Sequence, residues 1–247
     1  MHLLVSVANA EEAAAALAGG ADIIDAKNPA AGALGAVPGS VFREIRSVVG
    51  IARPVTAALG DASDGIAIER AAREAAGAGA RFVKVGFAGI ENTSTIAELL
   101  AAAVFGSRAV SVEKTGVVAA AYADAARVKA VAFEDLLEAA ALGGAEGVLV
   151  DTADKRGPGL RQLVTASTLT RWIADAHDAG MFIAVSGKLT ADDLPFARDA
   201  GADIAGVRGA ACLSGRTSAI SAERVRLLAR TLHGGDEDID LIDRHTR

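Results

Sequence analysis

The residues best suited to chemistry in this sequence are lysines and aspartates placed late in apolar segments. Asp25 and Lys27 follow an Ile-Ile pair, Lys84 lies inside an apolar five-residue segment, and Asp151 ends another. A lysine amine has an ordinary pKa of ~10.4 and must lose its proton before it attacks a carbonyl carbon. Burial and a neighbouring cation both favour the neutral amine, so lysines on nearby strands would lower each other's pKa. This set predicts Schiff-base chemistry, in which the iminium is an electron sink for enamine and aldol steps.

A purely structural role is the alternative for each of these residues. Lys84 would then form a buried ion pair with a neighbouring aspartate, and Asp25 and Asp151 would only neutralise the lysines. Even a neutralising aspartate would tune a lysine pKa. In the catalytic interpretation, the lysine that keeps its charge moves protons together with Asp25 or Asp151.

Two glycine-containing segments near the end of the chain predict a phosphate site. Ser186, Gly187 and Lys188 follow the seventh predicted strand, and a second group surrounds the end of the eighth, namely Gly206, Arg208, Gly209 and Ala210. In barrels of parallel strands, the loops after strands 7 and 8 commonly bind phosphate, because small residues let backbone N–H groups approach an anion. The alternative is that these glycines only form tight turns.

A repeated helix-to-strand junction predicts how these residues are positioned. A Gly-Ala pair followed by an apolar strand occurs four times, beginning at Gly20, Gly79, Gly144 and Gly201. The copies lie 59, 65 and 57 residues apart, about twice the ~30 residues of one strand–helix unit. Glycine suits the left-handed position that ends a helix. Each copy therefore marks every second strand, and the strands between them are predicted at 3–7, 54–59, 116–122 and 181–186.

Eight strands that alternate with amphipathic segments predict a (β/α)8 TIM barrel, with an open doubly wound sheet as the alternative. The predicted helices cover 11–17, 41–49, 66–76, 95–104, 133–142, 168–176, 192–200 and 222–232. The barrel is expected to be one catalytic domain over 1–233, followed by an acidic tail over 234–247.

Side-chain parity predicts which strand residues point into the barrel. Alternate residues of a strand face opposite sides of a sheet. Counted from each Gly-Ala junction, one parity contains every ionisable residue of the set, namely Asp25, Lys27, Lys84, Asp151 and Arg208. The other parity is aliphatic and is expected to face the helices, as at Ile24, Val83, Val85, Val148, Val150 and Val207. The five polar side chains are therefore expected to meet at the C-terminal ends of the strands, where barrel active sites form.

Composition excludes several classes of function. The net charge of −6 disfavours nucleic acid and acidic membranes as partners. No apolar run is long enough to span a membrane, and the first residues lack the basic region of a signal peptide, so a cytoplasmic location is expected. The four histidines and the single Cys212 show no metal-ligand spacing, so no metal is expected.

Five segments in register resemble the (5-formylfuran-3-yl)methyl phosphate synthase family, also called 4-(hydroxymethyl)-2-furancarboxaldehyde-phosphate synthases. The resemblance runs from about residue 3 to about residue 230 and is carried by 21–29 (ADIIDAKNP), 82–86 (FVKVG), 121–124 (AYAD), 151–155 (DTADK) and 206–212 (GVRGAAC). It implies condensation of two glyceraldehyde 3-phosphate molecules into a furan monophosphate, the precursor of methanofuran, with loss of phosphate and water and without a metal or organic cofactor.

The resemblance also implies roles for individual residues. Lys27 would form the Schiff base and Lys84 would transfer protons, assisted by Asp25, Asp151 and Lys155. Two other functions stay open: a class I aldolase-like barrel acting on another sugar phosphate, and a phosphate-binding barrel without turnover. The sequence leaves the oligomeric state open, a homo-oligomer included.

Overall fold

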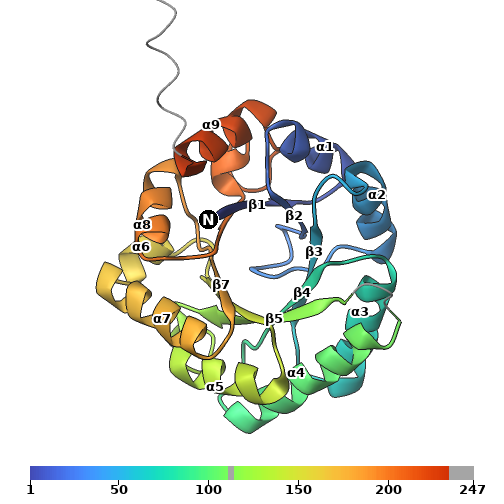
Figure 1. Ribbon diagram of the computed structural model, residues 1–247, viewed down its shortest axis with the longest axis vertical. Coiled ribbons are helices and arrows are strands. Elements are labelled where there is room, and N and C mark those ends of the chain that lie inside the picture. The colour runs from blue at the N-terminus through green and yellow to red at the C-terminus, as the bar shows by residue number, and fades with distance from the viewer. Residues whose placement is uncertain (111–113, 234–247) are drawn as a thin grey trace, which may run out of the picture.

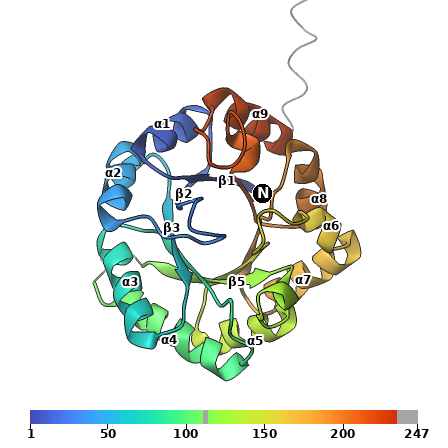
Figure 2. The ribbon, with the colours of Figure 1, turned by 180° about the vertical axis from the view of Figure 1, so that it is seen from behind.

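The computed structural model describes residues 1–110 and 114–233, which form a closed barrel of parallel strands surrounded by helices (Figures 1 and 2). The strands pair in chain order, and β8 closes the barrel against β1. They are β1 His2–Val7, β2 Ile23–Ala26, β3 Val55–Asp61, β4 Phe82–Gly86, β5 Gly116–Tyr122, β6 Gly147–Asp151, β7 Phe182–Val185 and β8 Ile204–Val207. The prediction of a TIM barrel is confirmed, and the open doubly wound alternative is wrong.

The helices follow the predicted segments with small differences. They are α1 Ala10–Ala18, α2 Gly39–Val49, α3 Gly65–Gly77, α4 Thr93–Arg108, α5 Phe133–Gly143, α6 Leu160–Leu163, α7 Ala166–Asp178, α8 Leu194–Asp199 and α9 Ala222–His233, with 3-10 turns η1 Ala125–Arg127, η2 Ala191–Asp193 and η3 Gly209–Ala211. The predicted helix at 192–200 is split into η2 and α8, because Pro195 lacks an N–H and fits only the first turn of a helix. The four-residue α6 is too short to show an apolar period. The predicted acidic tail lies outside the described residues.

The Gly-Ala junctions have the backbone conformation that was predicted for them. The glycines at 20, 79, 144 and 201 have φ angles of 90°, 88°, 76° and 97°. Residues with a Cβ rarely adopt this left-handed region, so glycine ends these helices and directs the chain into the next strand.

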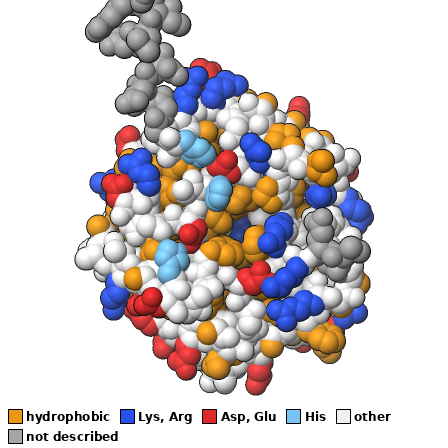
Figure 3. Space-filling view, viewed as in Figure 1, with side chains coloured by type: hydrophobic (Ala, Val, Ile, Leu, Met, Phe, Trp, Pro, Cys, Tyr) orange, Lys and Arg blue, Asp and Glu red, His pale blue; other side chains and the backbone are white. Residues whose placement is uncertain are grey.

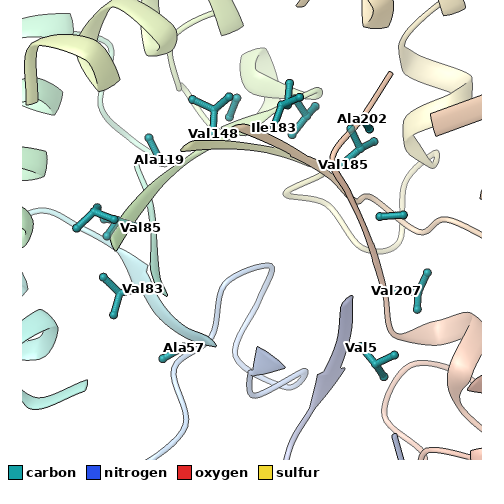
Figure 4. Close-up of a cluster of buried hydrophobic side chains, with 14 of the residues drawn as sticks. Val5, Ala57, Val83, Val85, Ala119, Val148, Ile183, Val185, Ala202 and Val207 are labelled. Atoms are coloured by element: carbon teal, nitrogen blue, oxygen red, sulfur yellow. The ribbon is translucent and has the colours of Figure 1, made fainter. Parts of the chain in front are cut away.

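Two apolar layers lie on the two sides of the barrel wall. The predicted outward-facing residues pack between the strands and the helices, as Val83, Val85, Val148 and Val207 show in Figure 4. A smaller cluster fills the barrel interior and includes Leu4, Val118 and Leu149. The prediction from side-chain parity is therefore confirmed for these valines, which face the helices and not the barrel interior.

The end of the barrel where the strands begin is closed by aromatic rings. Phe82 and Phe182 meet edge to face with centroids 5.0 Å apart. A Cβ on Gly147 would lie 2.5 Å from the Phe182 ring, so glycine is needed there for the ring to enter. Hydrophobic side chains occupy the centre of this face in Figure 3.

In the described part of the chain, no helix combines the length and apolarity needed to cross a membrane.

Candidate active site

Lys27 lies at the C-terminal end of the barrel, directly after β2. Its backbone N–H donates to the Val7 carbonyl, which continues the ladder with β1 and fixes the direction of the side chain. The amine lines a cavity of about 440 Å³ and lies 3.7 Å from Oδ2 of Asp151. Among the described residues, none forms a hydrogen bond with this amine. Lys27 therefore lines the cavity with an amine that no described residue holds by a hydrogen bond.

Asp151 and Lys155 form the second part of the site. Lys155 Nζ donates to Asp151 Oδ1 at 2.6 Å, and the Thr152 N–H donates to the same oxygen at 2.8 Å. Oδ2 of Asp151 is buried and has no hydrogen-bond partner in the described chain. Burial opposes the charge of Asp151, but Lys155 and Lys27 outweigh it and hold the pKa of this carboxyl below its ordinary value. Burial also lowers the pKa of Lys155, and Lys27 adds to this effect while Asp151 opposes it.

Lys84 and Asp25 form a separate buried ion pair on neighbouring parts of the wall. The carboxylate accepts hydrogen bonds from Ser6 Oγ at 2.8 Å and Thr56 Oγ1 at 2.7 Å. Burial lowers the pKa of Lys84, Asp25 opposes this shift, and Lys27 reinforces it. The ion pair places Lys84 on the same side of the sheet as Asp25, as parity predicted.

Ser6 and Thr56 were not predicted as site residues, although a signal for them exists. Both lie at inward parity on β1 and β3, and strand register pairs Ser6 with Asp25 and Asp25 with Thr56. Parity was counted only from the Gly-Ala junctions, and β1 and β3 have none. Extending the count to every strand would have found both hydroxyls.

Arg208 departs from the prediction that all five ionisable groups meet. It lines the cavity, but its Nη1 and Nη2 donate to the Glu12 carboxylate at 2.8 and 3.1 Å. Its Nη1 also donates to the Ser6 carbonyl at 2.9 Å. Because α1 brings Glu12 against the end of β8, the charge of Arg208 is neutralised by a residue from outside the barrel. Four of the five groups, namely Asp25, Lys27, Lys84 and Asp151, therefore form the lysine–aspartate cluster. Arg208 instead stabilises the loop after η3, where its Nε donates to the Arg216 carbonyl.

The residues predicted to bind phosphate lie together at one side of the same cavity. Its lining includes Ser186, Lys188, Gly206, Gly209 and Ala210. Gly187 lies between two of them with a φ of 101°. Lys188 has a left-handed φ of 63°, and its amine donates to the Gly157 carbonyl across the loop after β6. The two loops thus form one wall of the cavity, as expected from their place after β7 and β8.

Two further polar residues support the site from its rim. The Asp124 carboxylate accepts from the N–H groups of Ala153 and Asp154 at 2.7 and 2.8 Å, so it holds the loop that carries Lys155. Asp124 directly precedes η1, but its side chain makes no capping hydrogen bond there. Tyr122 Oη donates to Asp61 Oδ1 at 2.6 Å, and burial together with Asp61 raises the pKa of Tyr122.

The loop between β2 and α2 folds into the mouth of the barrel (Figure 2). Its Leu34 is 1% exposed and packs in the inner apolar cluster. Lys27 begins this loop, and Arg216 contacts it from the loop after η3. Over residues 1–110 and 114–233, no group of three or more His, Cys, Asp or Glu side chains is arranged to hold a metal ion.

Comparison with known proteins identifies the family. A family model described as 4-HFC-P synthase matches residues 3–229. The chain belongs to the 4-HFC-P synthase family. A relative from Methanopyrus kandleri named (5-formylfuran-3-yl)methyl phosphate synthase is 40% identical over 235 residues, which cover 94% of this chain and 98% of the relative. A relative of the same name from Methanocaldococcus jannaschii is 40% identical over 217 residues, covering 87% of this chain and 92% of the relative.

Solved structures extend the likeness of this 4-HFC-P synthase family member to other barrels. The structure of a 3-hexulose-6-phosphate synthase is 25% identical with a TM-score of 0.57, and the match covers 92% of this chain and 99% of that one. The structure of KGPDC from Streptococcus mutans has a TM-score of 0.67 at 14% identity, covering 94% and 97% of the two chains, and shows the fold alone. The family resemblance expected from the five segments is confirmed, and the chain is an enzyme of the synthase type that the family name describes.

Proposed function

We propose that this protein is a (5-formylfuran-3-yl)methyl phosphate synthase that condenses two glyceraldehyde 3-phosphate molecules through a Schiff base on Lys27. The observation that carries the proposal is the difference between the amines. Lys84 and Lys155 each contact a carboxylate at hydrogen-bonding distance, whereas the Lys27 amine lies 3.7 Å from Asp151, has no hydrogen bond to a described residue and lines the cavity. The relatives named for this product support the choice of reaction. The atoms balance with release of one phosphate and two water molecules.

In this proposal the first step takes place between Lys27 and Asp151. The neutral Lys27 amine attacks the aldehyde carbon of one triose, and the carbinolamine loses water to give an iminium. Asp151 Oδ2 lies 3.7 Å from the amine and has no hydrogen-bond partner within the described residues, so it is free to accept the proton that the amine must lose. Lys155, bound to the other oxygen of the same carboxylate, supplies a proton to the departing hydroxyl.

The later proton transfers belong to Lys84 in this scheme. Removing a proton from the carbon next to the iminium needs a neutral amine, and burial lowers the pKa of Lys84 in that direction. Asp25 accepts from two hydroxyl groups, so it is held in place and orients Lys84. Structural rigidity of this kind keeps a base within reach of one carbon and not its neighbours.

The loops after β7 and β8 would hold the phosphoryl group of a triose. Anchoring that end fixes the carbonyl at a set distance and makes its attack by Lys27 effectively unimolecular. The product would be the furan precursor of methanofuran.

The test is trapping combined with a product assay. Purified protein given glyceraldehyde 3-phosphate alone should develop the ultraviolet absorbance of a furan aldehyde, and borohydride should fix a triose on Lys27. Lys27→Ala and Lys27→Arg should each lose both signals, because alanine has no amine and arginine keeps its proton. Equal trapping in the wild type and Lys27→Ala would overturn the assignment of Lys27.

A second candidate is a class I aldolase-like barrel acting on another sugar phosphate. The 25% identity to a 3-hexulose-6-phosphate synthase favours it over unrelated chemistry. A lysine adduct without furan absorbance would support this candidate. Absence of any adduct would favour a phosphate-binding barrel without turnover.

A further inference from the structure

Arg216 is a cation of the active-site cavity that the reaction scheme above does not use. It lies in the loop between η3 and α9 and lines the same cavity as Lys27 and Lys155. Its Nη1 donates to the Pro29 carbonyl at 2.7 Å, and its Nη2 donates to the Gly32 carbonyl at 3.2 Å. The side chain thus links the loop after β8 to the loop that begins at Lys27.

No carboxylate in the described residues forms an ion pair with Arg216. This distinguishes it from Arg208, which is paired with Glu12. The two hydrogen bonds to backbone carbonyls use two of the five N–H donors of a guanidinium. The rest of the group can receive an anion. Arg216 and Lys155 line the same cavity, and the charge of Arg216 adds to the burial that lowers the pKa of Lys155.

The backbone of Arg216 is also fixed in place. Its carbonyl accepts a hydrogen bond from Arg208 Nε at 2.6 Å. Because Arg208 is held by Glu12 and by the Ser6 carbonyl, the position of Arg216 is set by contacts that reach back to β1 and α1. A preorganised guanidinium loses little side-chain freedom when an anion binds, which favours binding.

Two triose phosphates bring two phosphoryl groups into one cavity. Their reacting carbons must meet at Lys27, and a chain of only three carbons separates each aldehyde from its own phosphate. Two phosphate dianions bound together by the loops after β7 and β8 would repel each other strongly. The loops after β7 and β8 can therefore hold one phosphoryl group, and the second needs another cation at the mouth.

We propose that Arg216, with Lys155 beside it, forms a second anion subsite that binds the phosphoryl group of the second triose phosphate. This inference rests on the function proposed above. It also explains the contact with the loop after β2. An anion on Arg216 is held next to the segment that begins at Lys27, so occupation of the second subsite stabilises the observed position of that loop.

The first test counts anion sites without turnover. Inorganic phosphate titrated into the wild type by calorimetry should bind at two sites per chain, and Arg216→Gln should keep one. Arg226→Gln is a matched control, because Arg226 is an exposed arginine on α9 whose only side-chain hydrogen bond in the described structure is to the Ala18 carbonyl at 3.4 Å. This control should keep both sites. One site in the wild type, or two in Arg216→Gln, would overturn the subsite.

The second test separates binding of the second triose from formation of the Schiff base. Arg216→Gln should raise the KM for glyceraldehyde 3-phosphate by about 10- to 100-fold, the effect of losing hydrogen bonds to a charged group. Borohydride trapping of a single triose on Lys27 should stay at the wild-type level. Arg216→Lys keeps a cation and should recover part of the loss. A raised KM beside unchanged trapping is what a merely structural role does not predict, because loss of the two carbonyl contacts would disturb the loop that begins at Lys27 and with it the trapping.

The outcomes distinguish this inference from the function on which it rests. A wild-type enzyme that forms the furan aldehyde while Arg216→Gln keeps the same KM would refute the role of Arg216 alone. A wild type without trapping or product would refute the proposed function, and the phosphate count would still report on the subsite. If Arg216→Gln does not fold, the same measurements on Arg216→Lys decide, with weaker binding at the second site expected and unchanged binding at both sites contradicting the proposal.

Discussion

Replacing Lys84 by methionine should separate the structural and chemical parts of the Lys84–Asp25 pair. Methionine keeps most of the length and volume of the lysine side chain and removes its charge. The pair lies inside the barrel, where Asp25 is 0% exposed and the Lys84 side chain is 7% exposed. In Lys84→Met the carboxylate keeps only the hydroxyl groups of Ser6 and Thr56 as partners.

The size of the effect follows from burial. Removing one partner of a buried ion pair costs about 3–5 kcal/mol, because the other charge stays in the interior without compensation. Adding Asp25→Asn removes that charge, and the amide oxygen can still accept from one hydroxyl group while the amide N–H donates to the oxygen of the other. The double variant should therefore be more stable than Lys84→Met. For a chain of 247 residues, the single change corresponds to a fall in Tm of about 6–20 °C.

Urea unfolding followed by tryptophan fluorescence measures the free energy of unfolding of the wild type, Lys84→Met and the double variant. The single tryptophan, Trp172, stacks on Phe133 with ring centroids 4.7 Å apart, so its emission should report loss of the packed state. The folded fraction of Lys84→Met should retain borohydride trapping of a triose on Lys27 and lose most furan formation. Trapping measured on the same sample separates lost chemistry from lost folding.

Two results would refute this reasoning. If Lys84→Met is as stable as the double variant, the Asp25 charge is not left uncompensated in the interior. If folded Lys84→Met loses trapping completely, Lys84 takes part in forming the Schiff base, and the division of work between the two lysines is wrong.

Three further measurements test the site. Tyr122→Phe should lower the free energy of unfolding by about 0.5–1.5 kcal/mol, because the buried Tyr122 loses its 2.6 Å hydrogen bond to Asp61 while the exposed carboxylate can turn to water, and a thermal melt checks this. Since burial lowers the pKa of Lys84, the rate should rise with pH through a value below 10.5, and a pH–rate profile should lose this limb in Lys84→Arg. Asp151 has a lowered pKa, so its contribution to stability is present above pH 3.8 and is lost as the pH falls through the folded-state value; Asp151→Asn should remove this part of the acid destabilisation, measured by urea unfolding across that range.

Local patterns in the sequence were enough to predict the architecture. The Gly-Ala junction recurs because each helix must end and turn into a strand, and glycine alone adopts the required φ without strain. Alternation along a strand then assigned Lys27, Lys84, Asp25 and Asp151 to the inner face. Both rules depend only on residues close in the chain, so they could be applied without coordinates.

The pairing of those inner residues depends on contacts that no local rule contains. Closure of the barrel and the register between strands decide that Asp25 receives Lys84 together with two hydroxyl groups, while Asp151 lies between Lys27 and Lys155. Parity gives the side of the sheet but not the neighbour on the next strand.

The paths of the loops decided the remaining features. Glu12 reaches Arg208 from a helix 196 residues earlier in the chain, and Arg216 meets carbonyl groups 184 and 187 residues away. These contacts arise because the first and last strands are neighbours in a closed barrel, which places the segments after β8 beside those after β1 and β2. The sequence by itself determined which chemical groups enter the barrel, and the tertiary structure decided which of their charges are neutralised and which are left for a ligand.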